Sequence, residues 1–224
     1  MDNGAVAHNG HPAAERSEAD QAYQRLQRMI IELELPPGTP LTEPTLVERI
    51  GIGRTPVREA LRRLAVERLV TIFPRRGMVV GHLGLGEVQQ LFEARDTIEA
   101  EIAALAARRA SERDDALLAG LNGAVHRAQE EGSFVAFLEA DRRLHHGFAQ
   151  VARSLFLEEA LGRILPLNAW LWHTHLVRYG IRDDDYASHD AIVAAIARRA
   201  PTEARAAMVA HVDRSRELLR VTLE

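Results

Sequence analysis

Residues 53–64 read GRTPVREALRRL, and this segment decides the fold of the first part of the chain. Its apolar side chains recur about one helical turn apart, at Val57, Leu61 and Leu64. That spacing is typical of an amphipathic helix. Thr55 is a suitable N-cap and Pro56 suits the first helical position, so we expect the helix to begin there.

Three arginines lie four residues apart on the face roughly opposite these apolar side chains, namely Arg54, Arg58 and Arg62. A charged helix face is most often plain solvated surface, so the surroundings have to decide. Residues 21–80 hold ten arginines and six acidic residues, a net charge of +4, whereas the whole chain carries −4. The chain contains no lysine, so every fixed side-chain cation is a guanidinium, which forks onto phosphates and base edges.

Two more short helices precede this segment, and a hairpin follows it. Apolar residues at helical spacing predict helices over 22–34 and 42–50, and a glycine turn separates the second helix from the third. Residues 69–73 and 78–80 read as two strands joined by a turn at 74–77. Three helices followed by a hairpin describe a winged helix-turn-helix.

A winged helix-turn-helix places its third helix in the major groove of DNA, with the first residues of that helix at base edges. Docking of the apolar stripe would leave Arg54, Arg58 and Arg62 pointing outward. Thr55 can offer its hydroxyl or backbone N–H to a phosphate, and the turn Arg75-Arg76-Gly77 lies at the wing tip, where it can meet the backbone or the minor groove. Each feature alone is weak, but together they favour binding of double-stranded DNA.

Residues 22–80, with PPGTPLTE, GRTPVREALRRL and RRGMVV, closely resemble the GntR family of bacterial transcription regulators. The resemblance implies a homodimer on a near-palindromic operator. It implies DNA contacts from Arg54, Thr55, Arg58 and Gly77, with Arg62 and Arg63 as phosphate contacts. Two positions depart from the family pattern: Pro44 stands where many members carry a basic residue, and Gly53 stands where a serine is usual.

The composition predicts a globular protein. With 224 residues, 46% of them hydrophobic, the chain can bury a substantial core. Residues 1–20 are acidic and contain no apolar run, which excludes a signal peptide and predicts a disordered tail. No segment approaches the roughly 18 apolar residues of a membrane span. The chain has no cysteine, hence no disulfide or thiolate metal site, and we expect a cytoplasmic protein.

From about residue 85 to the end the pattern is helical, in segments 86–110, 113–131, 133–152, 154–178, 185–199 and 202–222. An antiparallel bundle is the economical way to bury so many amphipathic helices. The sequence therefore predicts a mainly α protein in three parts. These are a disordered tail at 1–20, a winged helix-turn-helix domain at 21–82, and an all-helical domain for effector binding and dimerisation at 83–224.

Four titratable side chains fall on apolar helical stripes of the predicted bundle, namely Asp141, His145, His189 and His211. A buried carboxylate is costly unless it is paired or metal-bound, and neutral imidazoles are good ligands for zinc, nickel and similar ions. Asp141 and His145, four residues apart, could bind one ion from a single helix, and the other two would complete the set. The alternative is a group of separate core histidines, each satisfied by hydrogen bonds.

The remaining histidines are weaker candidates. His146 points about 100° away from His145 on a helix and is not expected to be a ligand. His173 and His175 could be helix-facing partners or surface groups. We regard the other four as incidental: His8, His11, His82 and His126.

Residues 85–222 as a whole resemble the FCD ligand-binding domain of the FadR-like branch of the GntR family. Metal-binding members show an Asp-x3-His pair followed by two histidines on the last two helices. The resemblance implies a divalent metal ion, zinc first with nickel or manganese possible, on Asp141, His145, His189 and His211. It also implies that Arg95 binds the carboxylate of a small effector. Arg95 lies on an inward stripe, so the alternative is a salt bridge to a core carboxylate.

The sequence thus predicts a DNA-binding transcription regulator, not an enzyme, whose helical domain binds a metal ion and a small organic acid that modulates operator binding. One alternative is a metal-dependent hydrolase with an accessory DNA-binding domain. Such an enzyme needs a general base beside the metal-bound water, and the sequence contains neither HExxH nor a Glu-x-x-His pair. Another alternative, an architectural DNA binder without a ligand, is disfavoured by the inward polar residues.

Overall fold

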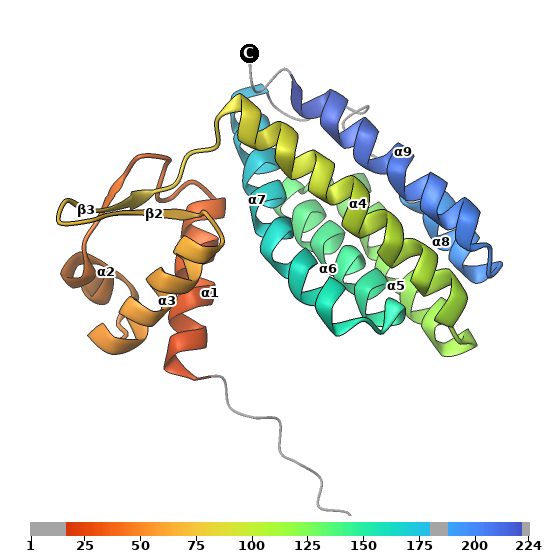
Figure 1. The fold of residues 1–224 in the computed structure, drawn as a ribbon, viewed down its shortest axis with the longest axis horizontal. Coiled ribbons are helices and arrows are strands. Elements are labelled where there is room, and N and C mark those ends of the chain that lie inside the picture. The colour runs from red at the N-terminus through yellow and green to blue at the C-terminus, as the bar shows by residue number, and fades with distance from the viewer. Residues whose placement is uncertain (1–16, 180–187, 221–224) are drawn as a thin grey trace, which may run out of the picture.

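The computed structural model describes residues 17–179 and 188–220, which form two units joined by a short connection (Figure 1). The N-terminal unit holds three helices and a small sheet, and the C-terminal unit is a helical bundle. The predicted mainly α fold is therefore confirmed. Within the described ranges, no helix combines the length and hydropathy that a membrane crossing requires.

The N-terminal unit consists of α1 (Glu18–Ile31), β1 (Pro40–Leu41), α2 (Glu43–Ile50), α3 (Arg54–Val66), β2 (Val70–Phe73) and β3 (Gly77–Val80). Helix α1 begins before residue 21, so residues 18–20 belong to a helix and not to the expected tail; residues 1–16 of that tail lie outside the described residues. Helices α1 and α3 pack against each other through buried apolar side chains, among them Leu26, Ile30, Leu61 and Leu64.

Helix α3 begins earlier than the sequence predicted. Its N-cap is Gly53, whose extended backbone has φ −61° and ψ 164°, and no side chain caps the helix. The expectation of Thr55 as N-cap is therefore wrong. Pro56 still fits because it stays within the first turn, where the backbone N–H has no acceptor inside the helix. The consequence is that Arg54 and Thr55 both lie on the first turn of α3.

The hairpin of β2 and β3 lies where the sequence predicted it, to within one residue at the start of each strand. The strands are antiparallel, with Val70 opposite Val80 and Phe73 opposite Gly77. The turn between them needs left-handed backbone at Arg75 (φ 63°) and Gly77 (φ 99°), and glycine adopts that conformation at little cost. Strand β1 was not predicted, because two residues are too short to show a pattern; it pairs with the other edge of β3.

The C-terminal unit consists of α4 (Leu85–Arg109), α5 (Glu112–Glu130), α6 (Phe134–Ala152), α7 (Leu155–Tyr179), α8 (Asp190–Ala197) and α9 (Pro201–Arg220). These helices match the six predicted segments, although α8 is shorter than the segment expected at 185–199. Residues 185–187 and the end of the segment expected at 202–222 lie outside the described residues.

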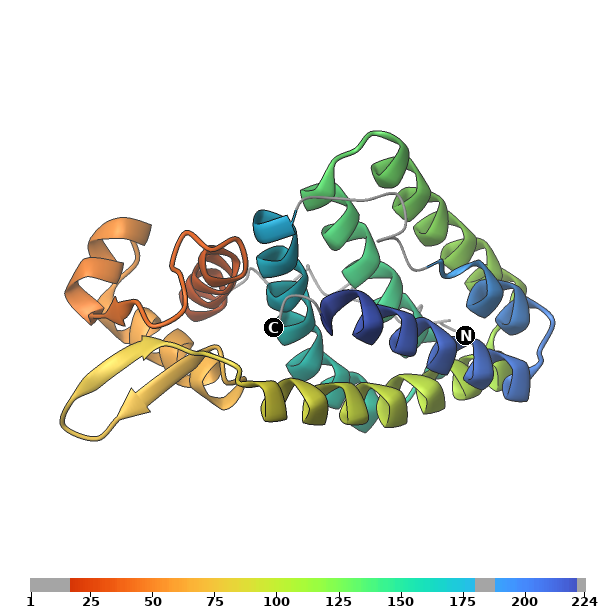
Figure 2. The ribbon, with the colours of Figure 1, turned by 90° about the horizontal axis from the view of Figure 1, so that it is seen from above.

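The long helices of the bundle lie side by side. Helix α4 runs along α9, and α5 runs along α6, as Figures 1 and 2 both show. Helix α7 packs against α4 and α6 on one side and against α1 of the N-terminal unit on the other. Eight consecutive residues of α7, 165–172, are buried. Helix α7 thus packs against the N-terminal unit as well as within the bundle, and Glu87 of α4 adds a salt bridge to Arg68.

Candidate functional site

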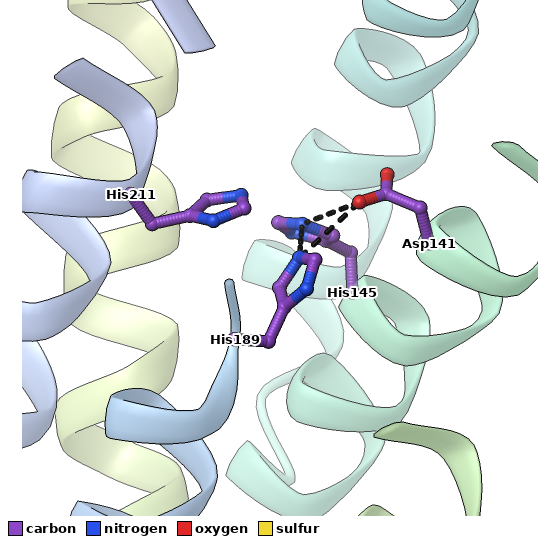
Figure 3. Close-up of side chains that lie close together, drawn as sticks. All are labelled: Asp141, His145, His189 and His211. Atoms are coloured by element: carbon purple, nitrogen blue, oxygen red, sulfur yellow. Dashed lines mark hydrogen bonds and ion pairs between the residues drawn. The ribbon is translucent and has the colours of Figure 1, made fainter. Parts of the chain in front are cut away.

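The four predicted ligands come together in the middle of the bundle (Figure 3). Asp141 and His145 lie one turn apart on α6, His211 lies on α9, and His189 is the N-cap residue of α8. His189 makes no side-chain capping hydrogen bond, which leaves its imidazole for the cluster. One nitrogen or carboxylate oxygen from each residue lies within 4.8 Å of the other three.

The distances within the cluster suit a bound ion. Nε2 of His145 lies 3.2 Å from Nε2 of His189 and 3.8 Å from Oδ1 of Asp141, and Nε2 of His189 lies 3.2 Å from the same oxygen. Ligand atoms about 2.1 Å from a shared ion are separated by about 3–4 Å. Three imidazoles and one carboxylate form a donor set for zinc, nickel or manganese, so the residues present fit a divalent metal ion.

Burial keeps two of the imidazoles in the neutral form that can bind a metal ion. The side chains of His189 and His211 are buried, and burial lowers the pKa of both below the usual histidine value, with the neighbouring histidine charges acting further on His211. Their Nδ1 atoms find no hydrogen-bond partner within the described part of the chain. A metal ligand must be a neutral imidazole, which is the form that this environment favours.

Glu99 of α4 supports the cluster from outside. Its Oε2 lies 2.5 Å from Nδ1 of His145, and both side chains are buried. A carboxylate at Nδ1 directs Nε2 of the same ring toward a metal. Burial lowers the pKa of His145, but the charges of Glu99 and Asp141 outweigh burial and raise that pKa above its usual value. Burial likewise raises the pKa of Glu99, and Arg95 and His145 outweigh it, so that this pKa lies well below its usual range.

Arg95 is buried on α4 and has several polar partners. Its Nε donates to Oε1 of Glu99 at 2.6 Å, and its Nη1 donates to Oδ1 of Asn168 at 2.7 Å and to Oγ of Ser215 at 3.3 Å. The salt bridge to a core carboxylate that the sequence left open is therefore present. Arg95 also lines a small pocket beside the cluster, with Phe137, Leu138, Asp141, Asn168, Trp172, His211 and Ser215.

The end of α8 that carries His189 is tied to α5. Asp190 accepts a hydrogen bond from Nδ2 of Asn122 at 2.6 Å, and its Oδ1 lies 2.8 Å from Nε2 of His126. His126, expected from the sequence to be incidental, lies outside the four-residue cluster but contacts the residue after His189. These contacts fix the residue that follows His189.

Several of these residues were missed from the sequence. Glu99 carried a usable signal, because it lies four residues after Arg95 and thus on the same face of a helix. Asn168, Asn122 and Asp190 carried no such signal, since their partners come from distant segments. The remaining histidines of the described region lie apart from the cluster: His82 is exposed, His146 and His173 are half-buried, and His175 is buried against the rings of Trp172 and Tyr179.

The residues predicted to contact DNA lie on the surface of the N-terminal unit. All eight of them are exposed, namely Arg54, Thr55, Arg58, Arg62, Arg63, Arg75, Arg76 and Gly77. Arg58 forms a two-point salt bridge with Glu43 of α2. Arg63 turns toward α1, where its guanidinium lies 4.1 Å from the ring centre of Tyr23 and donates to Asp20. Arg54, Arg58 and Arg62 are therefore accessible on the outer face of α3, whereas Arg63 lies on the side that faces α1.

Each of the two units matches a known protein-family model. Residues 18–80 match the family described as bacterial regulatory proteins, gntR family, and residues 90–214 match the FCD domain. The chain belongs to the GntR family, in the group with an FCD domain. The family and its named relatives are transcription regulators and not enzymes, in agreement with the prediction from sequence.

Known relatives of this GntR-family chain carry regulator names. It is 33% identical over 135 residues to the HTH-type transcriptional repressor RspR of Escherichia coli, covering 59% of this chain and 58% of the relative. It is 32% identical over 139 residues to an uncharacterised HTH-type regulator of Streptomyces ambofaciens, covering 61% and 57%. The matched region thus spans less than two thirds of each of these relatives. The solved structure of E. coli McbR/YncC shares the fold, with a TM-score of 0.83, 21% identity, and 94% and 100% of the two chains covered.

Proposed function

We propose that this GntR-family protein is a ligand-responsive transcription regulator. It binds a near-palindromic operator in double-stranded DNA as a homodimer, and a small carboxylate effector that enters the bundle beside a bound metal ion alters its DNA affinity. The observation that carries the proposal is the converging cluster of Asp141, His145, His189 and His211 beside Arg95, in a chain that also carries a basic winged helix-turn-helix.

The DNA-binding part of the proposal rests on α3 and the wing. Arg54, Arg58 and Arg62 are exposed on α3, opposite its buried apolar face. In the major groove this face would put guanidiniums at base edges and phosphates. Arg75 and Arg76 at the exposed wing turn can reach the DNA backbone or the minor groove.

The metal would be held by the four cluster residues, with Glu99 orienting His145. When bound, a divalent ion supplies a fixed positive charge and open coordination positions that a carboxylate or hydroxyl can occupy. Zinc is the first expectation for this donor set, with nickel or manganese as alternatives. The protein's own part is to keep His189 and His211 neutral and to aim all three imidazoles at one point.

The effector would bind in the pocket that Arg95 lines. The Nη2 group of Arg95 has no hydrogen bond to the described residues around it, whereas Nε and Nη1 do. That group can meet one oxygen of a carboxylate. The pocket holds little more than a water molecule, so an organic acid has to displace side chains such as Trp172 to enter.

Helix α7 offers a route from the pocket to the DNA-binding unit. Asn168 and Trp172 of α7 line the pocket, and α7 also packs against α1 of the N-terminal unit. An effector that moves α7 would therefore act on α1, which packs against α3. An effector changes DNA affinity only by as much as it binds the two conformations differently, and opening of the pocket supplies that difference.

The proposal is tested with the full chain and a pool of duplexes with randomised centres. Selected sequences should contain two inverted half-sites about 10 base pairs apart, as a symmetric dimer requires. Affinity for a selected duplex is then measured with metal-loaded protein and a panel of small mono- and dicarboxylates, each paired with its uncharged amide. A carboxylate that shifts the DNA affinity while its amide does not supports the proposal. Failure to enrich any sequence, or equal effects of acid and amide, would contradict it.

A further inference from the structure

Glu43 and Arg58 form a two-point salt bridge on the surface that faces DNA in the proposed function. Nε of Arg58 donates to Oε1 of Glu43 at 2.7 Å, and Nη2 donates to Oε2, also at 2.7 Å. The pair joins α2 to α3 across 15 positions of sequence. The side chain of Arg58 is 55% exposed and that of Glu43 is 24% exposed, so the carboxylate lies beneath a guanidinium that still faces outward.

The position of Glu43 is fixed by its helix. It is the first residue of α2, where Thr42 acts as N-cap with its hydroxyl near the backbone N–H of Thr45. A carboxylate at this end of a helix is stabilised by the helix dipole. Leu46 and Ile50 anchor α2 in the core, and the turn at Gly51 sets its angle to α3. Glu43 is therefore a preformed support and not a freely moving partner.

The two hydrogen bonds to Glu43 occupy one edge of the Arg58 guanidinium and leave its outer end available for another partner. A guanidinium has five N–H groups, and Glu43 takes the one on Nε and one on Nη2. Both N–H groups of Nη1 and the second one of Nη2 remain. Together they form the end-on fork that matches O6 and N7 of guanine in the major groove.

We propose that Glu43 determines base specificity by holding Arg58 end-on toward a guanine. Glu43 touches no base in this arrangement, so it is a positioning residue for Arg58. Because the salt bridge already restricts the Arg58 side chain, that side chain loses less conformational entropy when the protein binds DNA. The salt bridge also keeps the guanidinium away from nearby phosphates. The proposal rests on the proposed reading of base edges by α3 and adds the residue that sets how Arg58 is presented.

The charge of Glu43 acts in the same direction. The hydrogen bond from Arg58 and the charges of Arg58, Arg54 and Arg62 outweigh burial and lower the pKa of Glu43, which favours its ionised form. The carboxylate of Glu43 repels DNA phosphates whatever the base sequence. The contact between Arg58 and a guanine forms only at a matching sequence, where it offsets this repulsion. Glu43 should therefore weaken non-specific binding more than specific binding.

The test compares Glu43→Gln with Glu59→Gln in the full chain. Glu59 is exposed on α3, so its replacement removes the same charge from the same basic unit without touching Arg58. Each variant selects from the pool of randomised duplexes, and its affinity for the sequence selected by wild type and for a scrambled duplex is measured at two salt concentrations. Thermal melting of each variant checks that the unit stays folded, and Arg58→Ala completes the set.

Glu43→Gln should bind the scrambled duplex more tightly and lose about tenfold in the ratio of specific to scrambled affinity, which is the order of one bidentate base contact. Enrichment of guanine at one symmetric pair of positions should fall, as it should in Arg58→Ala, and Glu59→Gln should keep it. If Arg58→Ala loses this guanine preference and Glu43→Gln keeps it, the role of Glu43 is refuted. If Arg58→Ala also keeps it, base reading by Arg58 fails and the inference fails with it.

Discussion

Glu99 joins His145 to Arg95 in the centre of the bundle. Its Oε2 lies 2.5 Å from Nδ1 of His145, and its Oε1 accepts a hydrogen bond from Arg95 at 2.6 Å. One carboxylate thus supports a proposed metal ligand with one oxygen and the pocket arginine with the other. We therefore expect a change at the proposed metal site to affect Arg95 through Glu99, and a change at Arg95 to affect His145.

Replacing Glu99 with glutamine should weaken metal binding. The amide carries no charge to hold the proton on Nδ1, so Nε2 of His145 is no longer fixed as the metal-binding atom. Loss of such a supporting group typically weakens metal affinity about 10- to 100-fold. Competition with a chromophoric chelator measures the affinity for zinc, and Glu101→Gln, a partly exposed residue of the same helix that pairs with Arg108 and Arg205, is the control. Equal affinities in wild type and Glu99→Gln would contradict the role of Glu99.

Metal affinity should fall with decreasing pH, beginning above the usual pKa of histidine. Glu99 and Asp141 outweigh burial and raise the pKa of His145, whereas burial lowers the pKa of His189. Protons therefore compete with the metal first at His145, at pH values above the usual pKa of histidine. Zinc titrations between pH 5.5 and 8 measure this, and in Glu99→Gln the onset should move to lower pH. An affinity that stays constant from pH 8 to pH 6 would rule out this assignment.

Asn122→Ala should lower metal affinity several-fold while changing the melting of metal-free protein little. Asn122 holds Asp190, the neighbour of the proposed ligand His189, so its loss frees that end of α8. The matched control is Asp115→Asn, which breaks the contact of α5 with Arg199 just beyond the other end of α8. Calorimetric zinc titration and thermal melting of both variants separate the two effects. A similar loss of zinc affinity in both variants would mean that general loosening, and not the placement of His189, is responsible.

Arg95→Met should destabilise the bundle by about 3–5 kcal/mol, because it leaves the buried carboxylate of Glu99 without its main counter-charge. The double variant Arg95→Met with Glu99→Gln should recover part of this loss, since the uncompensated charge is gone. Urea unfolding of both variants gives the free energies. A double variant that is no more stable than Arg95→Met would show that packing, and not the charge of Glu99, sets the cost.

Much of the fold could be read from the sequence because it depends on local periodicity. The apolar stripe of α3 and the hairpin of the wing are short-range patterns, and the four cluster residues stood out as polar groups on apolar helix faces. The start of α3 was misplaced because the extended backbone of Gly53 begins the helix without any side-chain signal. A two-residue strand such as β1 carries no pattern at all.

The partners of the site were harder to predict because they come from distant segments. Asn168 lies 73 positions from Arg95, and Asp190 lies 64 positions from His126. The pairing of Glu43 with Arg58 depends on the angle between α2 and α3, which the turn at Gly51 sets. Sequence patterns indicate which face of a helix is buried, but the meeting of two faces is a property of the packed structure.

Metal content is the most direct test of the central claim, that Asp141, His145, His189 and His211 hold one ion inside the regulator. Native mass spectrometry of the full chain, purified without chelator and then dialysed against zinc, nickel or manganese, measures it for wild type and His189→Ala. The account predicts one ion per wild-type chain, a higher melting temperature with the ion than after EDTA, and loss of both in His189→Ala. A wild-type chain that takes up no stoichiometric metal under any of these conditions, with a melt unchanged by EDTA, would contradict it and leave the four residues as a hydrogen-bonded polar cluster.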